Sequence, residues 1–107
     1  MSYKIIPVLN FQKEAKRLIK KYHSLKEDLT LLNNSLCENP EQGKPLGNNC
    51  YKIRVAIKSK NKGKSGGARV ISCVYSIQKE VFLLSIYDKS EKNTILDNEI
   101  KKLLENI

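Results

Sequence analysis

Lys52 and Arg54 lie two residues apart in a segment where apolar and polar residues alternate, so both side chains are expected on one face of a strand. Along a strand this spacing is about 6–7 Å, which suits two cations that address one phosphodiester group. RNA is cut without a metal when a base removes the 2′-hydroxyl proton, cations stabilise the attacked phosphate, and an acid protonates the leaving 5′-oxygen. These two residues are therefore candidates for phosphate chemistry.

The sequence does not offer the residue types that a metal site needs. No group of carboxylates is spaced to hold Mg²⁺, and the only histidine, His23, falls in the helical part of the chain. Cys37, Cys50 and Cys73 are widely spaced and include no C-x-x-C pair, so we predict reduced thiols, not a zinc site or a disulfide framework. We expect no metal and no cofactor. A lysine whose pKa is lowered by neighbouring cations could then act as the base.

The positive charge is concentrated in one central segment. The formal net charge is +9, from 20 Lys and Arg against 11 Asp and Glu, and residues 42–79 hold nine of the cations and no acid. Without that segment, the chain carries eleven cations and eleven acids, which balance. Such a concentrated field attracts a polyanion, first of all nucleic acid. A run of solvated surface lysines is the alternative interpretation.

The elements that position this segment follow from periodicity and from Gly and Pro. In chain order we expect a strand (3–9), two helices that end before 39–40, a turn-rich stretch (39–49), an alternating strand (51–58), a Lys- and Gly-rich loop (59–67), two apolar strands (68–77 and 81–87) and a helix (94–107). Pro7 places the first strand at a sheet edge. The two apolar strands should be covered on both faces.

These elements predict one α+β domain over residues 1–107, in the order strand, helix, helix, three strands, helix. We expect a mostly antiparallel sheet, with the helices against one face: two N-terminal helices packed on it, and a C-terminal helix. No apolar run is long enough to cross a bilayer and no signal-peptide segment is present. The chain is therefore expected to be cytoplasmic, without a membrane partner.

Five motifs in order resemble those of a known family. They are Phe-Gln-Lys-Glu-Ala-Lys-Arg-Leu (11–18), Asn-Pro-Glu-Gln-Gly (39–43), Cys-Tyr-Lys-Ile-Arg (50–54), Gly-Lys-Ser-Gly-Gly-Ala-Arg-Val-Ile (63–71) and Leu-Leu-Ser-Ile-Tyr-Asp-Lys-Ser-Glu-Lys (83–92). Together they resemble the RelE/HigB toxins of bacterial type II toxin–antitoxin systems. The resemblance runs from about Phe11 to the C-terminal helix, and it implies the small RelE-like sandwich fold.

The resemblance also implies a function. Such toxins are mRNA interferases, metal-independent endoribonucleases that cut messages, usually in the ribosomal A site, and so inhibit translation. The implied partners are mRNA, the ribosome and a cognate antitoxin, with operator DNA reached only through the antitoxin complex. Two alternatives share the fold: a non-nucleolytic ParE-like toxin that inhibits gyrase, and a nucleic-acid-binding protein without catalysis.

The family's motifs suggest roles for the central cations. The resemblance places the catalytic lysine and arginine on the strand of Lys52 and Arg54, so Lys52 is the candidate base and Arg54 the phosphate ligand. Arg69 matches the arginine after the loop and is assigned transition-state stabilisation. Lys89 could supply the acid or a phosphate contact, and Tyr87 could stack on a nucleobase or belong to the core. For each cation, the alternative is a solvated position on a strand.

Two further points concern the general acid and the loop. RelE-type toxins carry an arginine near the position of Lys89 and a later tyrosine, whereas here no tyrosine follows Tyr87, so the resemblance does not identify the acid. The loop lysines are expected to hold the RNA backbone through charge, not to do chemistry. These RNA-binding candidates are Lys58, Lys60, Lys62 and Lys64.

Overall fold

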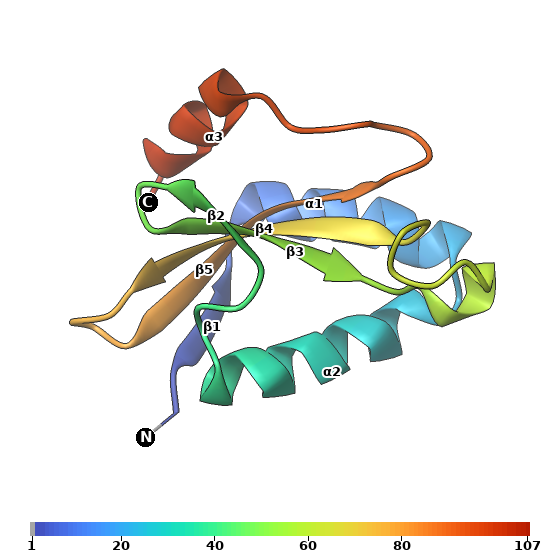
Figure 1. The fold of residues 1–107 in the computed structure, drawn as a ribbon, viewed down its shortest axis with the longest axis horizontal. Helices are drawn as coiled ribbons and strands as arrows, with labels where there is room; N and C mark the ends of the chain where they lie inside the picture. The colour runs from blue at the N-terminus through green and yellow to red at the C-terminus, as the bar shows by residue number, and fades with distance from the viewer. Residues whose placement is uncertain (1) are drawn as a thin grey trace.

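A five-stranded sheet carries helices on both of its faces (Figure 1). The structure is a computed structural model that describes residues 2–107. The elements are β1 (Lys4–Pro7), α1 (Leu9–Lys21), α2 (Leu25–Glu38), β2 (Lys44–Gly47), β3 (Cys50–Val55), the short 3-10 helix η1 (Lys58–Lys60), β4 (Ala68–Tyr75), β5 (Glu80–Asp88) and α3 (Asp97–Leu104). The strand order is β1-β5-β4-β3-β2; the β1–β5 pair is parallel and the other three pairs are antiparallel. The α+β class and the mostly antiparallel sheet are confirmed.

β1 lies at one edge of the sheet, as Pro7 predicts, because a proline has no N–H to donate to a neighbouring strand. It pairs with only the first half of β5. Side chains of α1 form hydrogen bonds with backbone groups in the second half of that strand. Asn10 Nδ2 donates to the Leu84 carbonyl at 2.9 Å, and Glu14 Oε1 accepts from the Ile86 backbone N–H at 3.2 Å. Helix side chains thus satisfy β5 backbone groups that β1 does not reach.

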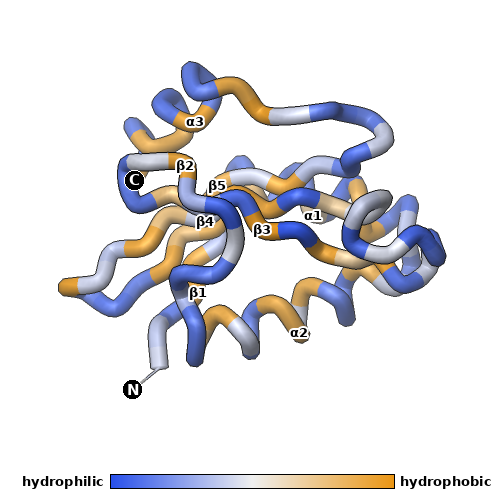
Figure 2. The backbone as a smooth tube through the Cα atoms, viewed as in Figure 1, coloured by the Kyte–Doolittle hydropathy of each residue, from blue (hydrophilic) through white to orange (hydrophobic). Residues whose placement is uncertain are grey.

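Helices α1 and α2 pack on one face of the sheet. Figure 2 shows apolar residues recurring along α2 and through the central strands. The shared cluster includes Phe11, Ala15, Leu18, Leu25, Leu29, Leu32 and Leu36 from the helices, and Ile53, Val70, Leu83 and Ile86 from the strands. Burying a side chain of this kind contributes about 1.5–3 kcal/mol, so this apolar layer is a major source of stability.

The C-terminal helix lies on the opposite face, which differs from the expectation that the helices share one face. A second cluster gathers there under α3 and the segment before it: Cys50, Ile71, Cys73, Leu84, Tyr87, Ile95 and Ile100. The reason lies in β4, where every residue from Ala68 to Val74 is buried. A strand that is apolar on both faces needs cover on both.

β2 is a strand that the sequence analysis did not predict. Its four residues include Pro45 and Gly47, which are typical of turns, so the pattern favoured an irregular stretch. Asn48 and Asn49 join β2 to β3 with positive φ angles of 53° and 63°, the type I′ geometry of tight hairpins. This hairpin makes β2 the second edge of the sheet and places Lys44 beside β3.

The C-terminal helix begins later in the chain than the apolar periodicity predicted. α3 begins at Asp97, whereas the periodicity predicted a helix from 94. The three cysteines are free thiols, with Cys50 and Cys73 buried. Among residues 2–107, no helix combines the length and the apolar character needed to span a membrane.

Candidate active site

The register of β3 and β4 sets two arginines directly opposite each other, Arg54 and Arg69. The Val74 N–H donates to the Asn49 carbonyl, and hydrogen-bonded pairs alternate along an antiparallel ladder. Arg54 and Arg69 therefore form a non-hydrogen-bonded pair, the kind in which facing side chains come closest. Like charges in such a pair are unfavourable. An anion bound between them would remove the penalty, so the pair is a candidate anion site.

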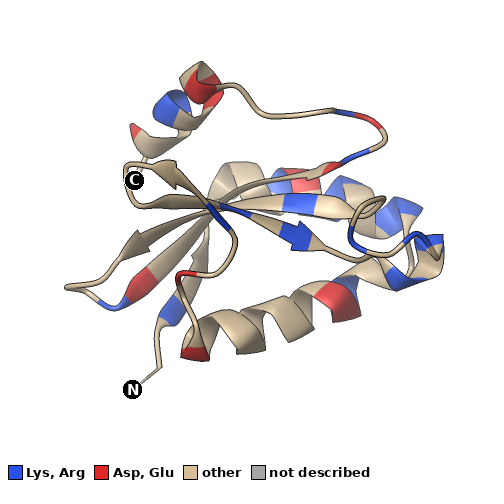
Figure 3. Ribbon diagram, viewed as in Figure 1, with Lys and Arg blue, Asp and Glu red and all other residues tan. Residues whose placement is uncertain are grey.

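The two arginines open onto a cavity of about 730 Å³. It is lined by Gln42, Gly43, Lys44, Lys52, Ile53, Arg54, Lys64, Arg69 and Lys89. Six of these nine residues are cations and none is an acid. Figure 3 shows basic segments of β3 and β4 side by side over the middle of the sheet. The fold thus brings together β2, β3, the start of β4, the end of β5 and the loop before β4 around one positive cavity, called the cationic pocket below.

Arg69 has a structural task as well as its charge. It is only 5% exposed, and its guanidinium donates to the carbonyls of Lys64 (2.9 Å), Ala68 (3.2 Å) and Ser65 (3.4 Å). A guanidinium has five N–H groups, so donors are left for a ligand. Arg69 therefore holds the loop in place and presents a fixed positive charge to the cationic pocket.

Lys52 lies in surroundings that favour its neutral form. Burial is the first cause of its lowered pKa, and four cations add to the effect: Lys44, Lys89, Arg69 and Arg54. Within residues 2–107 no ion pair with an acid opposes this shift. A lysine with a lowered pKa gives up its proton more readily near neutral pH, and it can then accept one from a hydroxyl group.

Lys89 and Gly67 fix the junction where β5 ends beside the loop. The Lys89 ammonium donates to the Asn93 carbonyl and to Asn93 Oδ1, both at 2.7 Å, and the Lys89 N–H donates to the Gly67 carbonyl at 3.0 Å. A Cβ at Gly67 would lie 2.1 Å from the Val55 carbonyl oxygen. Only glycine permits this approach, which positions the first residues of β4 against β3.

Comparison with known proteins decides the family. The family model described as the RelE toxin of the RelE/RelB toxin–antitoxin system matches residues 4–106. The chain belongs to the RelE toxin family. Among solved structures, a mutant of the Escherichia coli toxin RelE in the free state, with two arginines replaced by alanine, aligns with a TM-score of 0.66 at 20% identity. The alignment covers 100% of this chain and 99% of that chain, so the RelE-like fold is confirmed over its length.

The loop lysines of this RelE-family chain have unequal surroundings. Lys58 and Lys62 are exposed outside the cationic pocket, whereas Lys64 lines it. Lys60 departs from the expectation of RNA binding, because its side chain is only 8% exposed and its ammonium pairs with Asp88 at 2.8 Å. The Lys60 ammonium is therefore held in an ion pair and is largely withdrawn from solvent, unlike the other loop lysines.

Asp88 is the centre of a buried polar cluster next to the pocket of this RelE-family chain. Its carboxylate accepts hydrogen bonds from the Lys60 ammonium, the Tyr22 hydroxyl, and the backbone N–H and hydroxyl of Ser90. Burial by itself raises the pKa of Asp88, but these donors outweigh it and hold the pKa well below its ordinary value. The cluster ties α1, η1 and the end of β5 together, immediately before Lys89.

Tyr87 does not line the cationic pocket of the RelE-family fold. It is 5% exposed and belongs to the apolar cluster under α3, with the Lys92 ammonium 5.6 Å from its ring centroid. Its hydroxyl is buried and has no hydrogen-bond partner among residues 2–107. The expectation of a stacking or catalytic Tyr87 is therefore corrected in favour of the core alternative, since a ring packed under α3 has no free face for a base.

Lys44 is the cation of the pocket to which the sequence analysis assigned no role. It lies on β2 directly opposite Lys52 and contributes to lowering the pKa of Lys52. A usable signal was present, because Lys44 opens the acid-free segment, but the strand that carries it was not recognised.

Proposed function

We propose that this chain, the toxin of a toxin–antitoxin system, is a metal-independent endoribonuclease that cleaves messenger RNA in the ribosomal A site and so inhibits translation. The observation that carries the proposal is the convergence of Lys52, Arg54 and Arg69 on one acid-free pocket. A cavity with six cations fits the backbone of a polyanion. Its paired arginines fit the oxygens of one phosphate group.

Lys52 is proposed as the base that takes the 2′-hydroxyl proton. The lowered pKa makes Lys52 a better acceptor for that proton than an ordinary lysine, and the attacking oxygen then forms a bond to phosphorus as the bond to the 5′-oxygen breaks. Arg54 is exposed and, within residues 2–107, its side chain makes no hydrogen bond or ion pair, so all its donors are open to non-bridging phosphate oxygens. Arg69, held by the loop carbonyls, stabilises the added negative charge without reorganising.

Lys89 is proposed as the group that faces the leaving 5′-oxygen. Its ammonium lines the cationic pocket and is held by Asn93, so it can donate a proton or a hydrogen bond as the P–O bond breaks. Lys44 and Lys64 are proposed to bind flanking phosphates, since each lines the pocket with a flexible cationic side chain. The reaction then leaves a 2′,3′-cyclic phosphate and a 5′-hydroxyl.

The proposed partners follow from membership in the family. A cognate antitoxin neutralises the toxin, mRNA on the ribosome is the substrate, and operator DNA is contacted only through the antitoxin complex. These partners place the proposed action in the cytoplasm. An acidic antitoxin segment is favoured, because the chain carries a formal net charge of +9.

The test is induced expression of the wild type, Lys52→Ala and Arg54→Ala, with growth and message integrity followed together. We expect growth arrest with mapped cleavage sites for the wild type, and neither for the two variants. Lys101→Ala, an exposed lysine on α3, is the matched control and should behave as wild type. Arrest with intact messages, or arrest that persists in both variants, would contradict the nuclease proposal and favour a gyrase-type target.

A further inference from the structure

Two of the three thiols face each other across the sheet. The register sets Cys50 on β3 directly opposite Cys73 on β4, beside the hairpin that joins β2 to β3. The Val74 N–H donates to the Asn49 carbonyl, so the next pair along the ladder is a non-hydrogen-bonded one. The Cα atoms of such a pair lie about 4.5 Å apart, which is within the range that a disulfide spans.

Both side chains turn to the same side of the sheet and meet one acceptor. Cys50 Sγ lies 3.6 Å and Cys73 Sγ 3.8 Å from the Asn48 carbonyl oxygen. Both residues are 1% exposed and belong to the apolar cluster under α3. The strands and the shared acceptor therefore hold the two sulfur atoms near one point, where a bond between them requires little movement.

The two thiols differ in acidity. The hydrogen bond with Cys73 is the first cause of a lowered pKa at Cys50, although burial opposes it. The same hydrogen bond and burial both raise the pKa of Cys73. Cys50 is therefore the member of the pair that loses its proton more readily, and a thiolate is the form of cysteine that attacks an oxidant.

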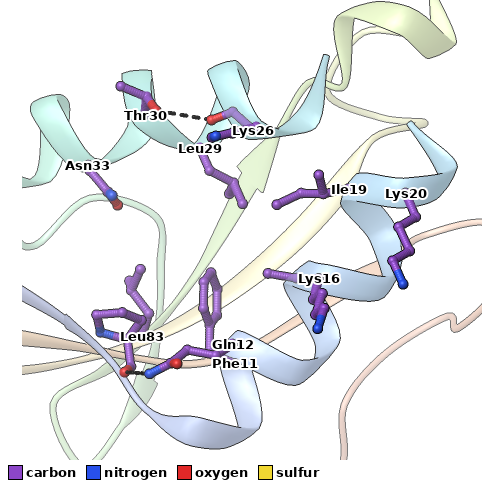
Figure 4. A pocket seen from close by; sticks show the side chains of 12 residues that line it. Phe11, Gln12, Lys16, Ile19, Lys20, Lys26, Leu29, Thr30, Asn33 and Leu83 are labelled. Carbon is purple, nitrogen blue, oxygen red and sulfur yellow. Dashed lines mark hydrogen bonds between the residues drawn. The ribbon is translucent and has the colours of Figure 1, made fainter. Parts of the chain in front are cut away.

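A small molecule can approach the pair from the hairpin side. A cavity of about 500 Å³ lies there, and its lining includes Cys73, the hairpin residues Asn48 and Asn49, and Leu104 at the end of α3. The cavity between α1 and α2 on the other face differs, because none of the described residues that line it carries sulfur (Figure 4). The route to the two thiols therefore runs through the cavity beside the hairpin.

We propose that Cys50 and Cys73 are a thiol–disulfide site, at which hydrogen peroxide converts the two facing thiols to a cross-strand disulfide. The Cys50 thiolate attacks one peroxide oxygen: an S–O bond forms, the O–O bond breaks, and the other oxygen leaves as water with the proton that Cys50 gave up. The Cys73 sulfur then displaces the hydroxyl group of the Cys50 sulfenic acid, which leaves as water with the Cys73 proton. Two thiols and one peroxide thus give one disulfide and two waters.

The disulfide ties β3 to β4 across the segment that carries much of the cationic pocket. Four of the six pocket cations lie between the two cysteines in the sequence: Lys52, Arg54, Lys64 and Arg69. A cross-link that closes this long loop restricts the unfolded chain, so the oxidised protein is the more stable form. In a reducing compartment the thiols persist, and the disulfide forms when the oxidant appears. The site is thus a reversible cross-link, and it does not depend on the proposed function.

The test treats the purified, reduced full chain with a small excess of hydrogen peroxide and follows the intact mass, the cross-linked peptides and the melting temperature. We expect the mass to fall by two hydrogen atoms, with Cys50 and Cys73 in one linked peptide, and the melting temperature to rise by at least about 5 °C. Dithiothreitol should reverse both changes. Cys37→Ser, at the thiol of α2, is the matched control and should behave as wild type, whereas Cys50→Ser and Cys73→Ser should lose the cross-link and the rise.

Several results would overturn the inference. Addition of oxygen atoms without a cross-link would show that the two sulfur atoms do not meet in the folded chain, and so would a cross-link that forms only in denaturant. A linkage through Cys37, or an oxidised chain that melts at or below the temperature of the reduced chain, would also contradict it. The comparison of oxidised with reduced wild type requires no substitution, so the test stands even where Cys50→Ser or Cys73→Ser destabilises the fold.

Discussion

Replacing Asp88 by asparagine tests the buried cluster that holds the loop beside the pocket. The substitution keeps the shape of the side chain but removes the charge that faces the Lys60 ammonium, whose side chain is 8% exposed while that of Asp88 is 0% exposed. Removing one partner of a buried ion pair costs about 3–5 kcal/mol, because the other charge stays buried and unpaired. At about 4–8 °C per kcal/mol for a domain of this size, the melting temperature should fall by at least about 12 °C.

The assay is chemical and thermal unfolding of the wild type, Asp88→Asn, Lys60→Met and the double variant. The double variant should recover at least about 1 kcal/mol relative to the sum of the single losses, because it buries no orphaned ammonium. A loss below about 1 kcal/mol for Asp88→Asn, or strictly additive effects, would refute this account of the cluster.

The effect of Asp88→Asn on the free energy of unfolding should also depend on pH. The folded pKa of Asp88 lies below its ordinary value, so its stabilisation is fully present above about pH 4, the pKa region of an unfolded aspartate. As the pH falls below that value, the unfolded chain takes up the proton first and the stabilisation is lost. The gap in unfolding free energy between wild type and Asp88→Asn should therefore narrow on acidification; a gap that stays constant or widens would contradict the assigned pKa direction.

Three further variants test single contacts by their unfolding free energy. Gly67→Ala should lose about 1–3 kcal/mol, because its Cβ would meet the Val55 carbonyl oxygen at 2.1 Å; an unchanged value would show that this junction is not tight. Glu14→Ala should lose about 1–3 kcal/mol by leaving the Ile86 N–H without its acceptor, and a neutral result would mean that water replaces the carboxylate. Tyr87→Phe should be neutral or stabilising, since the buried hydroxyl has no hydrogen-bond partner in the described part of the chain, and a clear loss would reveal a hydrogen bond there.

Much of the site could be predicted because it depends on strand alternation. Side chains alternate between the two faces of a strand, so Lys52 and Arg54 share one face regardless of which strand lies beside them. The segment without acids also predicted that the electrostatic potential at the site is positive. That Arg54 faces Arg69 depends on the register between two strands, which the local pattern does not set.

The loop lysines show where sequence reasoning stops. Lys60 and Lys64 are chemically alike and four residues apart, yet the first pairs with Asp88 and the second lines the pocket. The difference arises from η1 and from Asn61, whose φ of 58° turns the chain between them. The burial of Tyr87 could not be predicted from the local sequence either, because it depends on α3 packing over the second face of the sheet.

The most direct test of the central claim is cleavage of an mRNA on the ribosome, compared with the same message carrying a single 2′-deoxynucleotide at the cleaved position. If Lys52 removes the 2′-hydroxyl proton, the natural message yields a 2′,3′-cyclic phosphate, the deoxy message stays intact, and Lys52→Ala slows cleavage by about 10²–10⁴-fold. Cleavage of the deoxy message at the natural rate, or a Lys52→Ala rate within threefold of wild type, would contradict the account.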